Sequence, residues 1–152
     1  MAVGKWHAFS ELFERMANAE IDFGSDTFKA IILGAGYTPD QNGDGDLADV
    51  VASEIADSGY ARVTLSGIAI ARVSGQTRIN WDSLDFGDDV SLTGKYIVIY
   101  DDTHADDALV CICDLNTAGT SATVSSTSGD FDINTAAADE LTITPVAYSA
   151  GN

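Results

Sequence analysis

The sequence is poor in basic residues. Of its 152 residues, 24 are Asp or Glu and only 7 are Lys or Arg, which gives a formal net charge of −17. No lysine or arginine follows Lys95. A protein this acidic repels the phosphates of nucleic acids and the anionic surface of membranes. We therefore expect no nucleic acid and no membrane among its partners.

Long apolar segments are also missing. No run of eighteen apolar residues occurs, which argues against a transmembrane helix. The opening residues, MAVGKWHAFSELFERM, contain neither the apolar centre nor the small-residue cleavage site of a signal peptide. We therefore expect the chain to be made, and to fold, in a cytoplasm.

Only two cysteines occur, Cys111 and Cys113, in the segment ALVCICDLN. In a strand, residues i and i+2 point the same way, so a disulfide between these two is geometrically unfavourable. A structural zinc site needs about four ligands, and the two histidines, His7 and His104, lie far away in the sequence. We interpret both cysteines as small buried apolar residues.

The common catalytic motifs are absent. The sequence contains no G-x-S-x-G, no phosphate-binding loop, no dinucleotide fingerprint and no H-E-x-x-H. Neither histidine has a serine or cysteine beside it in a recognisable nucleophile motif. A pair of catalytic carboxylates could be drawn from any of the 24 acidic residues, so such a pair predicts nothing. We expect that the protein is not an enzyme.

What is present indicates one globular domain. The chain is 45% hydrophobic and 20% charged, and its length suffices for a core. Residues 1–19 are predicted to form a helix, because Trp6, Phe9 and Phe13 recur at spacings of three and four. This aromatic stripe packs either on its own domain or on a neighbouring subunit, so the three residues are candidate contacts to another subunit or to a capsid.

Residues 20–152 are predicted to form a β domain. Apolar or alternating segments, separated by polar turns, occur at 26–34, 61–73, 78–86, 95–100, 108–115, 120–134 and 140–149. In the segment 61–73, Val63, Leu65, Ala69 and Val73 fall on one face, which predicts a half-buried strand with a bend at Gly67. Residues 47–55 are compatible with a turn or two of helix. Seven or eight short strands predict an antiparallel β-sandwich or a jelly-roll-like barrel.

The segment TPDQNGDGDLADV, residues 38–50, resembles a calcium-binding loop. Asp40, Asn42, Asp44 and Asp46 match positions 1, 3, 5 and 7 of an EF-hand loop, and a glycine stands at position 6. Position 12 is Val51, which cannot bind a metal ion. The pattern therefore predicts either an Asx-rich turn or a weak calcium site formed by these four residues.

Several segments together resemble small virion-associated proteins of tailed bacteriophages. The resemblance begins with ELFERMANAEIDFGSDTFKAIILGAGYTPD and LADVVASEIADSGYARVTL, and continues through INWDSLDFG, YIVIYDDT and LVCICDLN. In that family a short helix precedes an IDW-x-TDT-x-K-V-x-L strand, a Y-x-P loop and a GY-x-R segment. Strands with the patterns F-x-A-x-D-V-x-F, L-V-I-Y-x-D-T and L-I-x-x-I-D follow. The resemblance covers roughly residues 10–145, and departs from the family at the acidic loop and in the longer C-terminal region.

The resemblance implies a capsid decoration, or cement, protein on the outer surface of the phage head, made in the host bacterial cytoplasm. Its partner would be the major capsid protein, and a homotrimer or homodimer is expected. The aromatic N-terminal stripe, or the basic residues Arg62, Arg72 and Arg78, would supply the contact surface. Two alternatives stay open: another virion component of the neck, tail or head fibre, and a non-viral, calcium-stabilised β binding module.

Overall fold

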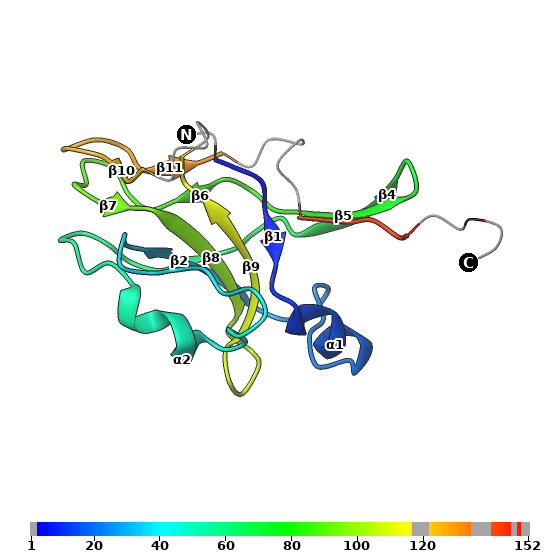
Figure 1. Cartoon of the computed structure of the whole chain (residues 1–152). Helices are drawn as coiled ribbons and strands as arrows, with labels where there is room; N and C mark the ends of the chain where they lie inside the picture. The colour runs from blue at the N-terminus through cyan, green and yellow to red at the C-terminus, as the bar shows by residue number, and fades with distance from the viewer. Residues whose placement is uncertain (1–2, 117–121, 135–140, 147–148, 150–152) are drawn as a thin grey trace.

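The structure is a computed structural model, and it describes residues 3–116, 122–134, 141–146 and 149. The protein is mainly β, and all its strand pairs are antiparallel, as predicted (Figure 1). The helical elements are α1 (Glu11–Ala17), α2 (Leu47–Val50) and the 3₁₀ turn η1 (Val51–Ser53). The strands are β1 (His7–Ala8), β2 (Phe28–Leu33), β3 (Val63–Thr64), β4 (Ala69–Val73), β5 (Gln76–Asn80), β6 (Leu84–Asp85), β7 (Thr93–Gly94), β8 (Tyr96–Asp101), β9 (Ala108–Asp114), β10 (Val124–Ser125), β11 (Asp132–Ile133) and β12 (Leu141–Ile143).

A five-stranded sheet with the order β1-β9-β8-β2-β3 forms the centre of the molecule. Its three longest strands, β2, β8 and β9, are rich in Ile, Val and Leu, which favour extended backbone. Strands β8 and β9 form a hairpin, and β2 pairs with β8 from Phe28 opposite Asp101 to Leu33 opposite Tyr96. The segments predicted from their apolar runs are thus confirmed as the central strands.

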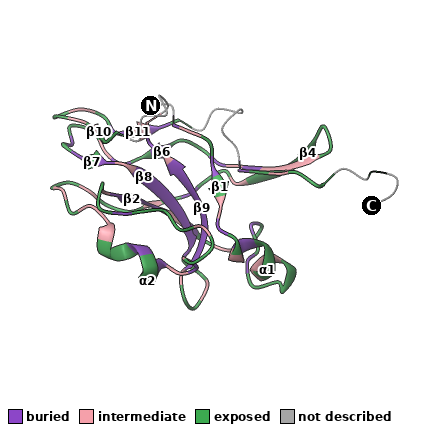
Figure 2. Ribbon diagram, in the orientation of Figure 1, coloured by how far each residue is buried: buried purple, intermediate pink, exposed green. Residues whose placement is uncertain are grey.

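Both faces of this sheet are buried (Figure 2). Residues Ala30, Ile32, Ile97 and Ile99 point to one face, and the side chains of the smaller sheets pack against them. Their neighbours Ile31, Leu33, Val98 and Tyr100 point to the opposite face. There, Leu47 and Val50 of α2 cover them, together with Tyr37 and Phe9. Burial on both faces explains why these strands read as continuous apolar runs.

Strand β9 contains a bulge. Ile99 pairs with Cys111 and Tyr100 pairs with Leu109, so Val110 is an extra residue without a partner in the ladder. The bulge lets Val110 and Cys111 face the same side of the sheet. Cys111 and Cys113 are both buried on that side and form no disulfide within the described residues, so the interpretation of the two cysteines as small buried residues is confirmed. Burial raises the pKa of the Cys111 thiol.

Three smaller sheets accompany the central one: β12-β5-β4, β11-β6 and β10-β7. They place Ile79, Leu84, Phe131, Ile133 and Leu141 in the core. Within the described ranges every sheet is open, and none closes into a barrel. No helix of that part of the chain is long and apolar enough to span a membrane.

Strands β4 and β5 form a hairpin that projects from the body (Figure 1). Gly67, with φ +63°, bends the chain between β3 and β4, at the position where the sequence predicts a bend. Ser74 and Gly75 form the two-residue turn at the tip, with φ +51° and +82°. The predicted burial of this segment is correct for Leu65 and wrong for β4, in which all five residues are exposed, because the bend directs β4 away from the core.

The prediction of a helix over residues 1–19 is wrong for residues 3–10, and its first two residues lie outside the described part of the chain. The helix α1 begins only at Glu11, and β1 precedes it as an edge strand of the central sheet. The backbone of this segment pairs with β9: His7 lies opposite Ile112, and the N–H of Phe9 donates to the carbonyl of Val110. Backbone pairing with the free edge of β9 therefore makes this segment a strand, although its aromatic residues have helical spacing. Because β1 belongs to the central sheet, the boundary between an N-terminal helix and a β domain at residue 20 does not hold, and α2 is a second helix.

Candidate functional site

Three of the four candidate calcium ligands of the acidic loop, Asp40, Asp44 and Asp46, have different partners. Asp40 Oδ1 accepts hydrogen bonds from the backbone N–H groups of Asn42 and Gly43, at 3.2 and 2.9 Å. Asp44 Oδ2 accepts one from the Tyr37 hydroxyl, at 2.6 Å. Burial and the Asp44 carboxylate raise the pKa of that hydroxyl. The Asx turn at Asp40 is the arrangement that the interpretation of the loop as an Asx-rich turn predicts.

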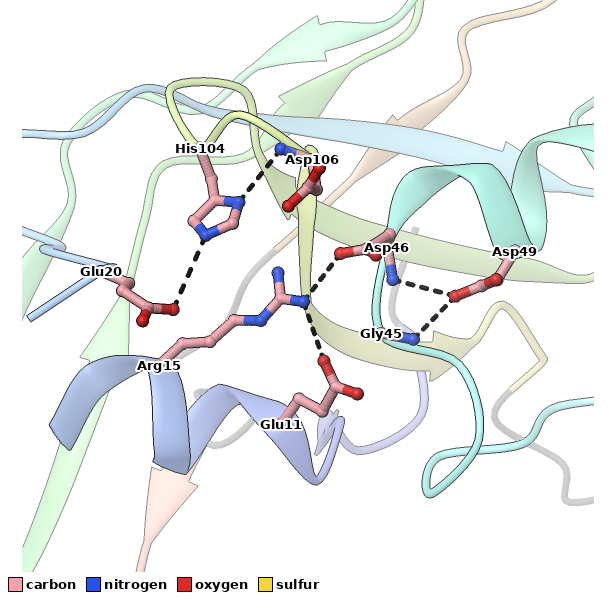
Figure 3. A network of polar contacts seen from close by, with 8 residues as sticks. All are labelled: Glu11, Arg15, Glu20, Gly45, Asp46, Asp49, His104 and Asp106. Atoms are coloured by element: carbon pink, nitrogen blue, oxygen red, sulfur yellow. Dashed lines mark hydrogen bonds and ion pairs between the residues drawn. The ribbon is translucent and has the colours of Figure 1, made fainter. Parts of the chain in front are cut away.

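The last of the four, Asp46, is held by Arg15 of α1 (Figure 3). One guanidinium nitrogen, Nη2, lies 2.8 Å from Asp46 Oδ1 and 2.8 Å from Glu11 Oε2. The backbone N–H groups of Gly45 and Asp46 both donate to Asp49 Oδ2, and they lower the pKa of that carboxyl. The ion pair joins α1 to the start of α2, which are far apart in the sequence.

These contacts bear on the metal site. Among the residues that the structure describes, no group of three or more His, Cys, Asp or Glu side chains could hold a metal ion. In this arrangement the loop is held by its own backbone, by Tyr37 and by Arg15. A calcium-bound loop would have to release Asp46 from Arg15 or do without its side chain.

The three aromatic residues proposed as contacts, Trp6, Phe9 and Phe13, lie in three different parts of the structure. Trp6 is 6% exposed and packs edge-on against Trp81, with ring centroids 5.1 Å apart. Phe9 is fully buried on the other side of the central sheet. Only Phe13, on α1, is on the surface, with 47% of its side chain exposed. Of the predicted stripe, Phe13 alone is available for contact with another molecule.

Neither histidine lies in a catalytic arrangement with a nucleophile among the described residues. His104 lies in the loop between β8 and β9, where its Nδ1 accepts a hydrogen bond from the backbone N–H of Asp106 at 3.2 Å. Its Nε2 lies 3.8 Å from Glu20 Oε2 (Figure 3). His7 is exposed on β1. Within the described ranges, neither histidine has a hydrogen bond to a serine, threonine or cysteine side chain.

Sequence reasoning missed a polar network beside strands β2 and β8, which joins Glu54, Tyr60, Arg62 and Tyr100. Arg62 donates to both oxygens of Glu54, from Nε at 2.9 Å and from Nη2 at 2.7 Å, and its Nη1 donates to the Tyr100 hydroxyl at 3.1 Å. The hydroxyl of Tyr60 donates to Glu54 at 2.8 Å and accepts from the backbone N–H of Ile32 at 3.0 Å. Hydrogen bonding to Glu54 raises the pKa of Arg62. This network ties the segment 54–62 to β2 and β8.

The network continues to the end of β8. The Tyr100 hydroxyl lies 3.4 Å from Asp102 Oδ1, and Lys29 Nζ forms an ion pair with Asp102 Oδ2 at 2.8 Å. Glu54 and Arg62 are eight residues apart, and Arg62 and Tyr100 are 38 apart. No local spacing rule connects residues at such separations, so the sequence offers no signal for this network beyond the presence of the residues.

Two segments that carry the family resemblance meet at the end of the central sheet. The N–H of Thr27 donates to Thr103 Oγ1, and the N–H of Asp102 donates to the carbonyl of Thr27, both at 2.8 Å. Asp101 is fully buried here, and its Oδ1 accepts from the N–H of Thr103 at 2.8 Å. Burial, opposed by these backbone hydrogen bonds, raises the pKa of Asp101, and the carboxylate of Asp26 raises it further.

Comparison of the chain with protein-family models, with curated proteins and with solved structures finds no match. The order of the segments and the contacts described above are therefore the observations on which a function can be proposed.

Proposed function

We propose that this protein is a structural component of a tailed-bacteriophage virion, and specifically a decoration protein that binds the outer surface of the head and stabilises it. The observation that carries the proposal is the order of the segments that resemble small virion-associated proteins. Three of these segments coincide with the central strands β2, β8 and β9. The similarity thus concerns the scaffold of the molecule and not a catalytic motif.

The scaffold fits a load-bearing task. A decoration protein has to keep its shape while the packed genome pushes the shell outward. The central sheet is buried on both faces, and polar contacts hold one of its ends: Thr27 with Thr103, and Arg62 with Glu54 and Tyr100. We propose that the smaller sheets complete a β-sandwich with the central sheet. Such a core supports a rigid module that is repeated in many copies.

The surface charge supports the same task. With a net charge of −17, copies displayed on neighbouring particles repel one another and repel nucleic acid. The partner would be the major capsid protein, contacted at many equivalent positions, with the decoration protein as a trimer or dimer. Many modest contacts together give a strong attachment, because each bound copy limits the movement of the shell subunits it joins. The protein is proposed to have no enzymatic role.

The proposal is tested by counting copies in purified particles of the phage that encodes the chain. Quantitative mass spectrometry gives the ratio of this chain to the major capsid protein. A decoration protein is expected at a ratio that approaches the capsid protein itself. A few copies per particle would indicate the alternative, a neck, tail or head-fibre component. Absence from the particle, with free protein in the lysate, would contradict both.

A further inference from the structure

Charge is distributed unevenly along this acidic chain. Between Asp57 and Asp82 the sequence contains three arginines, Arg62, Arg72 and Arg78, and no acidic residue. Residues 58–81 thus carry a charge of +3, so the rest of the chain carries −20. Arg62 of this stretch is used internally, in its pair with Glu54. Arg72 stands on the exposed strand β4, and no ion pair to it occurs in the described part of the chain.

The same stretch forms the projecting hairpin of β4 and β5. Strand β4 is the outer strand of its sheet, in the order β12-β5-β4, so one edge of its backbone is unpaired within the described part of the chain. All five of its residues are exposed, and four of them, Ala69, Ile70, Ala71 and Val73, are apolar (Figure 2). Ile70 is 55% exposed and Val73 is 39% exposed. An exposed apolar edge strand is a template for pairing with another chain.

We propose that the β4–β5 hairpin is a docking arm for a second copy of this protein, with the unpaired edge of β4 and Arg72 placed against the acidic body of the partner copy. Charge complementarity selects this partner, because the arm is positive and the body of every copy is strongly negative. The apolar side chains of β4 lose their exposure in the contact, and Arg72 gains carboxylate partners. The inference does not depend on the virion role, since self-association is measured on the isolated protein.

The test is sedimentation velocity of the full chain over a range of protein concentrations at moderate salt. The wild-type chain is expected to form dimers or larger oligomers. Ile70→Glu is expected to weaken association at least about tenfold, because it places a charge in the buried part of the contact. Arg72→Glu is expected to weaken it similarly. Melting temperatures of both variants should stay near that of the wild type, because both side chains are exposed in the monomer.

Matched controls separate the arm from general effects of charge. Ala105→Glu adds the same charge at an exposed apolar residue in the loop between β8 and β9, outside the arm, and Lys5→Glu reverses a charge outside the arm. Both are expected to leave association within about twofold of the wild type. In hydrogen exchange, β4 amides should become more protected as the protein concentration rises.

Two outcomes would overturn the inference. One is a wild-type chain that stays monomeric at every concentration, which would assign Arg72 the opposite role of a charge that prevents edge pairing. The other is an oligomer that Ile70→Glu and Ala105→Glu affect equally, or whose formation leaves β4 exchange unchanged. In that case another surface would join the copies.

Discussion

Arg62 and Glu54 face each other in a two-point ion pair, with Nε 2.9 Å from Oε1 and Nη2 2.7 Å from Oε2. The pair is partly shielded from solvent, since the Glu54 side chain is 13% exposed. Through the third arginine contact, to the Tyr100 hydroxyl, it fastens the segment 54–62 to the central sheet. Arg62, which the sequence offers as a contact residue, is therefore part of the internal structure of the protein.

The first prediction concerns this pair. Arg62→Lys keeps the charge and loses the two-point geometry, so it should lower the free energy of unfolding by roughly 1–2 kcal/mol. Arg72→Lys is the matched control, and a change below about 0.5 kcal/mol is expected there, because Arg72 is exposed. Urea unfolding monitored by circular dichroism measures both. Equal losses in the two variants would show that the pair does not stabilise the fold.

A second prediction concerns Asp101, which is fully buried, with Oδ2 lacking a hydrogen-bond partner among the described residues. Burial raises the pKa of this carboxyl, and its neighbour Asp26 raises it further. A raised pKa in the folded state means that the group's contribution to stability is complete below about pH 4, the range of an unfolded Asp, and is lost as the pH rises through the raised value. Asp101→Asn imitates the protonated form, and should stabilise the protein at pH 7 by roughly 1 kcal/mol.

The advantage of Asp101→Asn over the wild type should shrink as the pH falls toward 4. Urea unfolding at a series of pH values gives the difference directly. Asp106→Asn serves as the control, because it removes one exposed negative charge and leaves Asp101 in place. A difference between Asp101→Asn and the wild type that does not change with pH would refute the assignment of the raised pKa to Asp101.

The third prediction separates core from surface among the aromatic residues of the N-terminal segment. Trp6→Ala removes a buried ring that packs on Trp81, and should cost about 3–5 kcal/mol of unfolding free energy. Phe13→Ala should cost less than about 0.5 kcal/mol, because the side chain is half exposed. Denaturant melts of the isolated protein test this. A stable Trp6→Ala variant that fails to associate would instead make Trp6 an interface residue.

The fourth prediction concerns calcium. The loop has no ligand at Val51, so any calcium site should be weak, with a Kd of roughly 10⁻⁴ to 10⁻³ M. A ligand at 100 times its Kd adds about 2.7 kcal/mol, so low-millimolar calcium should add less. Thermal melts in EDTA and in calcium should therefore differ only slightly.

Asn42→Ala provides the matched test of the calcium loop. Its side chain is exposed and has no hydrogen bond within the described part of the chain, so the substitution should leave the calcium-free melt unchanged. Any calcium effect that depends on the loop should disappear in this variant. Unfolding of the wild type by EDTA at room temperature would show that the metal is structural, against this account.

The sequence predicts those parts of the fold that depend on residues close together in the chain. Strands β2, β8 and β9 are buried on both faces, so their apolar runs are visible in the sequence. Trp6 and Phe9 have helical spacing, yet they lie on opposite sides of the central sheet, which a helical face cannot explain. These residues follow the edge of β9, and the position of that edge depends on the tertiary structure.

The candidate site shows the same limit. The loop pattern correctly predicts the turn at Asp40, because Asp40 contacts its own neighbours in sequence. It cannot show that Asp46 is taken by Arg15, 31 residues away. The alternation of apolar and polar residues in 61–73 predicts a strand with two different faces. It does not show whether a core covers the apolar face, and in β4 no residue is buried. The absence of acidic residues from 58–81 was the one available sign that this segment differs from the rest.

The most direct test of the virion proposal is a cryo-electron microscopy reconstruction of particles with and without this chain. The account predicts extra density on the outer surface of the head, at positions repeated by the capsid symmetry, that fits the central sheet and disappears when the gene is deleted. Identical heads in the two reconstructions, or density confined to the neck or tail, would contradict a decoration role.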